Sequence, residues 1–249
     1  MSLIFDHIAA LQGDRPWGRV LDAGTGVNSL RWLRSVPTDA LTAVTGSDLM
    51  VTRIGDALGP SPAGERILVG NWAEPGFLAG ESFDTVVADY LIGSIEGFAP
   101  YFQDAMIRRL HALTGSRVYL VGLEPYVVER PSTPAGDIAF RIGRLRDTLL
   151  LLSGQKPYRE YPQVWVRHQL EAAGFRIVSA KTFPICHRAR FVEAQLDMCV
   201  HRLHLIADER LRAALGAHVE DLRREALALE AELGGLRHGF DYVIAAEPR

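Results

Sequence analysis

The sequence predicts an α/β protein built on a doubly wound, mostly parallel sheet. Short apolar and β-branched segments alternate five times with amphipathic segments at helical spacing. Two glycines, one position apart, follow the first apolar segment. A polar residue ends or follows each of the five segments, at Asp22, Asp48, Asn71, Asp89 and Glu124. The carboxyl ends of parallel strands share one edge of a sheet, so a ligand site is expected where these residues gather.

The first half of the chain contains the regular alternation. Ile4, Ile8 and Leu11 recur at helical spacing and predict the first helix. The Gly- and Pro-rich segment 59–64 ends the third helix, and Thr114-Gly115 ends the fourth. Helices are therefore expected over residues 3–12, 29–33, 50–58 and 99–113. Strands are expected over residues 18–22, 43–47, 66–69, 83–88 and 117–123.

The second half of the chain adds helical segments to this pattern. Helices are expected over residues 138–152, 165–173, 189–206 and 208–233, and strands over 175–179 and 240–246. The sequence reads as a single domain, 1–249, with helical insertions at 127–162 and 185–238. Because these insertions follow the fifth and sixth strands, we expect them to form a lid over the carboxyl edge. The last helix carries a leucine stripe that packs against a neighbour or supports a homodimer.

Composition and charge limit the partners, the cellular location and the metal content that are expected for this protein. The formal net charge is -3 and the pI is about 6.2, which argues against a nucleic-acid partner. No apolar run approaches the ~18 residues of a membrane span, and no leader peptide is apparent, so a cytoplasmic protein is expected. Cys186 and Cys199 lack CxxC spacing, and His201 and His204 lack a third ligand. No metal is therefore expected.

The segment from Asp22 to Gly26 is the most informative motif. An acid followed by Gly24 and Gly26 is typical of a buried strand that turns sharply into a helix with its N–H groups open to a ligand. A nicotinamide dinucleotide site is one interpretation, and Asp48 stands where such a site needs its ribose-binding acid. That fingerprint also needs a glycine at position 29, which is Ser29 here.

Order and spacing of these motifs resemble the class I S-adenosylmethionine-dependent methyltransferases. The resemblance covers residues 16–126, 163–184 and 240–247, and includes the Leu-x-x-Ala-Gly-Phe pattern at 170–175. It implies a Rossmann-like, seven-stranded sheet whose last strand is antiparallel, and S-adenosyl-L-methionine as cofactor, with S-adenosyl-L-homocysteine as product. The implied cofactor contacts are Asp22, Gly24, Gly26, Asp48, Leu49, Asn71, Trp72, Asp89 and Tyr90.

Each implied contact suits one part of that cofactor. Asp48 can accept hydrogen bonds from two ribose hydroxyls, and Asn71 lies near the adenine, with Trp72 offering a flat surface for stacking. Asp22 orders the glycine turn or meets the ammonium group. Asn28 stands in place of the family's third glycine and is expected to tolerate unusual backbone angles.

The acceptor is expected to be a small molecule methylated at an O, N or S atom. Asp89-Tyr90-Leu91-Ile92 follows the fourth strand, where methyltransferases of nucleobase or protein amide nitrogens carry Asn/Asp-Pro-Pro-Tyr. The candidates for a general base are His187, Tyr126 and Glu124. Two other interpretations stay open: an inactive cofactor-binding subunit that interacts through helix 208–233, and an NAD(P)-dependent oxidoreductase.

Overall fold

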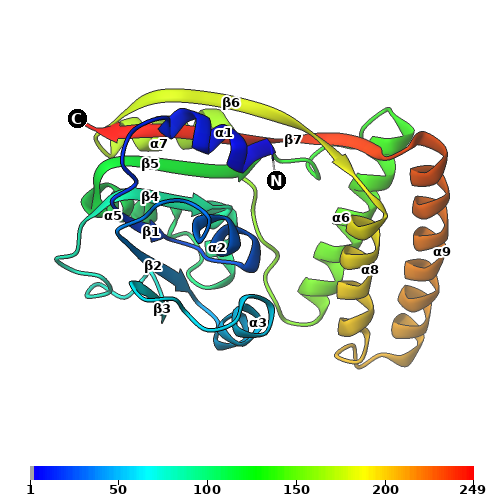
Figure 1. Ribbon diagram of the computed structural model, residues 1–249. Coiled ribbons are helices and arrows are strands. Elements are labelled where there is room, and N and C mark those ends of the chain that lie inside the picture. The colour runs from blue at the N-terminus through cyan, green and yellow to red at the C-terminus, as the bar shows by residue number, and fades with distance from the viewer. Residues whose placement is uncertain (1–2) are drawn as a thin grey trace. The chain divides into compact units, whose positions relative to one another are not determined.

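The computed structural model describes residues 3–249, which contain one seven-stranded mixed sheet in the order β3-β2-β1-β4-β5-β7-β6 (Figure 1). Neighbouring strands from β3 to β5 are parallel, and the last strand, β7, is antiparallel. The strands are β1 (Arg19–Asp22), β2 (Ala40–Thr45), β3 (Glu65–Val69), β4 (Phe83–Asp89), β5 (Thr114–Leu123), β6 (Phe175–His187) and β7 (Leu236–Pro248). The predicted fold class is confirmed.

Helices connect these strands. They are α1 (Leu3–Gln12), α2 (Val27–Leu33), α3 (Asp48–Leu58), α4 (Leu91–Ser94), the 3-10 turn η1 (Ile95–Gly97), α5 (Gln103–Leu113), α6 (Pro134–Leu152), α7 (Gln163–Ala172), α8 (Ala189–Leu203) and α9 (Glu209–Leu233). Within residues 3–249, every helix is too short or too polar to cross a bilayer.

Several predicted boundaries are wrong. The helix expected from residue 99 begins at Gln103, because residues 91–97 form two separate short helices. The helix ends at Leu113 as predicted, but β5 begins at once at Thr114 instead of at residue 117, and a Cβ on Gly115 would lie 3.2 Å from the Phe83 carbonyl oxygen of β4. The sixth and last strands are longer than expected, because each pairs along 13 residues of mixed burial that carry no clean alternation.

Alternation of side chains along the strands builds a core on each face of the sheet. In β5, Tyr119 and Val121 point to the face covered by α1, α2 and α3, whereas Val118 and Leu120 point to the face covered by α4, α5 and α7. Helices on both faces are the arrangement that a parallel sheet requires. The carboxyl ends of β1 to β4 are thereby left as the open edge where ligand-binding residues can gather.

The chain divides into two compact units. The sheet unit comprises the residues up to Leu123, Arg159–Phe183 and Tyr242–Arg249; the helical unit comprises Glu124–Tyr158 and Pro184–Asp241. The helical unit corresponds to the two expected insertions with shifted bounds, and residues 159–162 of the first insertion belong to the sheet unit. The core of the helical unit lies between α6, α8 and α9 and includes Ile142, Leu196 and Leu222.

Candidate functional site

The candidate site begins at the point where the strand order reverses, between β1 and β4. From β1 the chain adds β2 and β3 on one side and β4 and β5 on the other. Asp22 pairs with Val87 across the β1–β4 ladder, and the next peptide, Ala23 N–H, donates to the Val87 carbonyl over 2.8 Å. This register brings Asp22 and Asp89 to adjacent strand ends, where open α/β sheets bind ligands.

Asp22 is fully buried, with one carboxylate oxygen satisfied. Its Oδ2 accepts a hydrogen bond from the Ser29 hydroxyl over 2.9 Å, while its Oδ1 has no partner within residues 3–249. Burial raises the pKa of Asp22 to about 6, and the nearby hydroxyls of Thr25 and Ser29 and the peptide N–H of Gly24 oppose that rise. A buried carboxylate oxygen without a partner is costly, so it marks a place for a cationic or hydrogen-bond-donating ligand.

The two glycines of the turn, Gly24 and Gly26, have different surroundings where a side chain would begin. A Cβ on Gly24 would come within 3.1 Å of the Leu91 side chain, so Gly24 allows close packing of the turn against α4. A Cβ on Gly26 would meet no atom within 4 Å, and its φ is -135°, which any residue can adopt. The space at Gly26 is thus open to a ligand. Asn28 lies within α2, so the unusual backbone angles expected there are not needed.

Asp48 and Leu49 lie at the start of α3, directly after β2. Both are exposed, Leu49 by 60%, and neither is held by the core. Beside them, a Cβ on Gly46 would lie 2.7 Å from the ring of Phe98, whose side chain is 46% exposed. The arrangement combines a free carboxylate with two exposed apolar side chains at one edge of the sheet, which suits a ribose and a base.

Asn71 and Trp72 follow β3 but have different environments. The Asn71 side chain bridges two loops: its Nδ2 donates to the Phe98 carbonyl over 3.2 Å and its Oδ1 accepts from Ala73 N–H over 2.9 Å. Trp72 is only 5% exposed, and its ring packs edge-on against Phe77 in the core. The flat stacking surface expected from Trp72 is therefore not available, because the core covers the ring.

Asp89 and Tyr90 end β4 with a strained backbone. Tyr90 has a φ of 50° and a ψ of 18°, a left-handed conformation that costs free energy in a residue with a side chain. Its N–H donates to the Val121 carbonyl over 3.1 Å, which holds that conformation in place. Asp89 is half-buried and Tyr90 is 38% exposed, and both line a cavity of about 530 Å³.

The three candidates for a general base all belong to the helical unit. The His187 ring stacks on Phe191 with centroids 3.9 Å apart, and its Nε2 has no partner within residues 3–249. Burial lowers the pKa of His187 to about 4, so the imidazole is neutral at pH 7. The Tyr126 hydroxyl accepts from Arg146 Nη1 over 3.1 Å, and the Tyr126 and His187 rings lie 6.2 Å apart.

Glu124 has a different setting from the other two candidates. It is half-buried at the end of β5, and its peptide N–H donates to the Phe240 carbonyl over 2.9 Å. His187 and Tyr126 are brought together, and His238 Nε2 lies 3.2 Å from the Tyr126 carbonyl oxygen. His187 Nε2 is buried and has no partner within residues 3–249, and the lowered pKa makes this imidazole a weak base.

Sequence reasoning missed Phe98, Phe5 and Arg31 as site residues. Phe98 follows two short helices whose backbone could not be read from periodicity. Phe5 was predicted on a helix, but only the tertiary structure brings α1 over the strand ends.

Within residues 3–249, no group of three or more His, Cys, Asp or Glu side chains is arranged to hold a metal ion.

Comparison with known proteins relates the chain to solved structures. No protein-family model matches the sequence, and no curated protein matches it. A candidate methyltransferase from Bacillus halodurans matches with a TM-score of 0.60 at 15% identity, covering 98% of this chain and 97% of that one. The YcgJ protein from Bacillus subtilis matches with a TM-score of 0.58 at 13% identity, covering 99% of this chain and 97% of that one.

A third similar structure contains a ligand. It is an S-adenosylmethionine-dependent methyltransferase from Geobacter sulfurreducens in complex with S-adenosyl-L-homocysteine. It matches with a TM-score of 0.55 at 14% identity, covering 100% of this chain and 92% of that one. At such low identity, likeness establishes the fold and not the activity. The chain has the Rossmann-like fold of the S-adenosylmethionine-dependent methyltransferases.

Proposed function

We propose that this protein is an S-adenosylmethionine-dependent methyltransferase that acts on an O, N or S atom of a small molecule. The observation that carries the proposal is the buried Asp22 Oδ1, which has no partner within residues 3–249 and precedes a glycine turn with open space at Gly26. The fold similarity to a structure holding S-adenosyl-L-homocysteine supports the same cofactor here. We also propose that the protein acts in the cytoplasm.

The residues of the sheet unit fit the parts of that cofactor. Asp22 would accept the ammonium group, and the carboxylate of Asp48 would accept the two ribose hydroxyls. Leu49 and Phe98 would cover the faces of the adenine, and Asn71 would lie at its edge. The sequence led us to expect Trp72 to stack on the adenine; we now propose Phe98 for that contact.

When bound, the cofactor supplies a methyl group on a sulfonium, and the acceptor's lone pair bonds to that carbon as the carbon–sulfur electron pair returns to sulfur. Much of the rate can then come from holding the acceptor in line and excluding water. A hydroxyl or ammonium acceptor also loses a proton, and the candidates for the group that accepts it are His187, Tyr126 and Glu124. The Asp89-Tyr90-Leu91-Ile92 sequence after β4 favours a small molecule over nucleobase or protein amide nitrogens.

Calorimetric titration of the purified protein tests the proposal. S-adenosyl-L-homocysteine is expected to bind at micromolar concentration and NADH to show no heat. Binding of NADH alone would replace the proposal with a nicotinamide-dependent oxidoreductase. Binding of neither would leave a scaffold without this cofactor. Binding of S-adenosyl-L-homocysteine without turnover of any small-molecule acceptor would favour a cofactor-binding interaction subunit.

The homodimer expected from the leucine stripe is a separate proposal, and light scattering of the purified protein tests it.

A further inference from the structure

A cavity of about 530 Å³ lies next to the cofactor-binding turn but shares none of its glycines or Asp22. Its walls come from three elements of the sheet unit: Ile4 and Phe5 on α1, Arg31 and Trp32 on α2, and Asp89 and Tyr90 at the end of β4. This volume suits a small molecule. Because Asp89 and Tyr90 stand at the switch point, the cavity opens where a methyl acceptor has to reach the cofactor.

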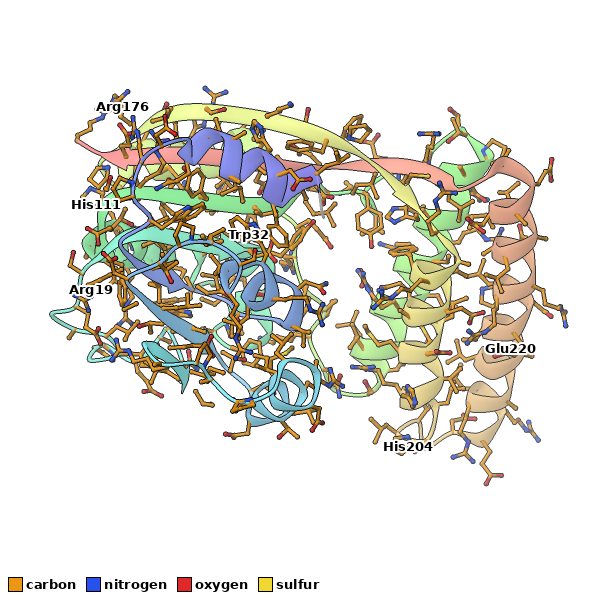
Figure 2. The ribbon with its side chains drawn as sticks, viewed as in Figure 1. Arg19, Trp32, His111, Arg176, His204 and Glu220 are labelled. Carbon is orange, nitrogen blue, oxygen red and sulfur yellow. The ribbon has the colours of Figure 1, made fainter. Side chains whose placement is uncertain are left out.

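The inner wall of the cavity is aromatic and rigid. The rings of Phe5 and Trp32 stack with centroids 4.7 Å apart and an interplanar angle of 3°, and Trp17 packs edge-on against Trp32 at 5.6 Å. Phe5 and Trp32 are 9% and 6% exposed. Trp32 is labelled on α2 in Figure 2. Both rings line the cavity although little of either is exposed, so the wall that they form is apolar and favours the flat, apolar body of a ligand.

Arg31 supplies a positive charge at this cavity, whose lining also includes Asp89. Its side chain is exposed, and within residues 3–249 it forms no ion pair; its recorded partner is Asn28 Oδ1, at 3.5 Å from Nη1. By contrast, Arg34, one turn further along the chain, makes two hydrogen bonds to the Glu65 carboxylate, at 2.8 and 2.7 Å. A guanidinium without an ion pair among the described residues, on the rim of an apolar pocket, is suited to a carboxylate, which it can bind through two parallel hydrogen bonds.

From these contacts we propose that the acceptor is an aromatic acid whose carboxylate pairs with Arg31 and whose ring lies against Phe5 and Trp32. The proposal rests on the proposed methyltransferase function and adds a substrate class to it. The acceptor's O, N or S atom would face Asp89 and Tyr90, opposite the carboxylate. The strained backbone of Tyr90 fixes that end of the pocket.

Matched acids and amides test the role of charge. Phenylacetate and phenylacetamide, and benzoate and benzamide, differ in charge but hardly in shape. Their dissociation constants are measured by ligand-detected NMR, with and without saturating S-adenosyl-L-homocysteine. Wild-type protein is expected to bind each acid about tenfold more tightly than its amide, as for one charge-assisted interaction. Arg31→Gln is expected to bring that ratio close to one with the amide affinity unchanged, and Arg31→Lys to retain part of it.

Arg167→Gln is the matched control, because Arg167 is an exposed arginine on α7 without an ion pair in the described residues. It is expected to leave the ratio unchanged. Equal binding of acid and amide by wild-type protein, no binding of either acid, or an unchanged ratio in Arg31→Gln would overturn the inference. Weaker binding of S-adenosyl-L-homocysteine by Arg31→Gln would also overturn it, by assigning Arg31 to the cofactor. Failure of wild-type protein to bind S-adenosyl-L-homocysteine counts against the proposed function instead, since the acid–amide ratio without it still reports on the pocket.

Discussion

The indole nitrogen of Trp72 donates a hydrogen bond to the carbonyl oxygen of Ala23 over 2.8 Å. Trp72 follows β3 and Ala23 follows β1, so the bond ties the segment after one strand to the start of the glycine turn after another. Arg109, on α5, holds the segment that contains Trp72. Its Nη1 donates to the Trp72 carbonyl oxygen and, over 2.6 Å, to the Glu74 carbonyl oxygen. Trp72 is therefore a support of the site.

Trp72→Phe is expected to lower both stability and cofactor affinity. The variant leaves the buried Ala23 carbonyl without its donor and opens a small cavity, which together cost about 1–3 kcal/mol of unfolding free energy. Urea denaturation measures this change, and calorimetry measures the affinity for S-adenosyl-L-homocysteine. Trp165→Phe is the control, since Trp165 packs on Tyr161 with ring centroids 4.5 Å apart, away from the turn. Equal affinity in Trp72→Phe and wild type would show that the bond does not support the site.

Asp48→Ala is expected to weaken S-adenosyl-L-homocysteine binding by about 10–100-fold, because two charge-assisted hydrogen bonds to the ribose are lost. Stability should change by less than about 1 kcal/mol, since Asp48 is exposed in the first turn of α3 and contributes there only through the helix dipole. Asp56→Ala, an exposed acid later in the same helix, is the control. Unchanged affinity in Asp48→Ala would remove Asp48 from the site.

Gly26→Ala separates folding from binding. The new methyl group meets no protein atom within 4 Å and the backbone is extended, so stability is expected to change by less than about 1 kcal/mol. The methyl group would occupy space needed by the ligand, so calorimetry is expected to show at least tenfold weaker binding of S-adenosyl-L-homocysteine. Binding as tight as that of wild type would mean that the open space at Gly26 is not used.

Titration of Asp22 should make cofactor binding depend on pH. The pKa of Asp22 in the free protein is about 6, so most of the carboxyl is ionised at pH 7 and most is protonated at pH 5. The ammonium group attracts only the ionised form, so affinity for S-adenosyl-L-homocysteine is expected to fall about tenfold from pH 7 to pH 5. Calorimetry across this range measures it. Asp22→Asn should bind more weakly and without this dependence; the same slope in both proteins would assign the effect to another group.

Burial of neutral His187 should make stability fall on acidification. The unfolded chain takes up a proton near the ordinary pKa of 6.5, whereas the folded protein does so only near 4. The stability contributed by this group is thus complete above pH 6.5 and is lost as the pH falls from 6.5 to about 4, by at most about 3 kcal/mol. Urea denaturation at pH 7 and pH 4.5, compared between wild type and His187→Gln, isolates the contribution. Equal losses in both proteins would contradict it.

Local patterns in the sequence were sufficient for the fold. Alternation of apolar strands with amphipathic helices predicted the doubly wound sheet, and each polar strand end from Asp22 to Asp89 could be placed at one edge because parallel strands share their direction. The boundaries at Gln103 and Thr114 were missed, since the two short helices before α5 have too few turns to show a period and Gly115 serves strand pairing.

The sequence by itself determined which residues follow each strand and therefore which ones could meet a nucleotide-like cofactor. Only the tertiary structure decided how each side chain is used. It buried Trp72, which follows β3 closely, and exposed Phe98, which follows two short helices, because burial depends on contacts between segments far apart in the chain. It left Asp22 Oδ1 without a partner and stacked Phe5 of α1 on Trp32 of α2. Such relationships are set by packing across the sheet, which no local pattern encodes.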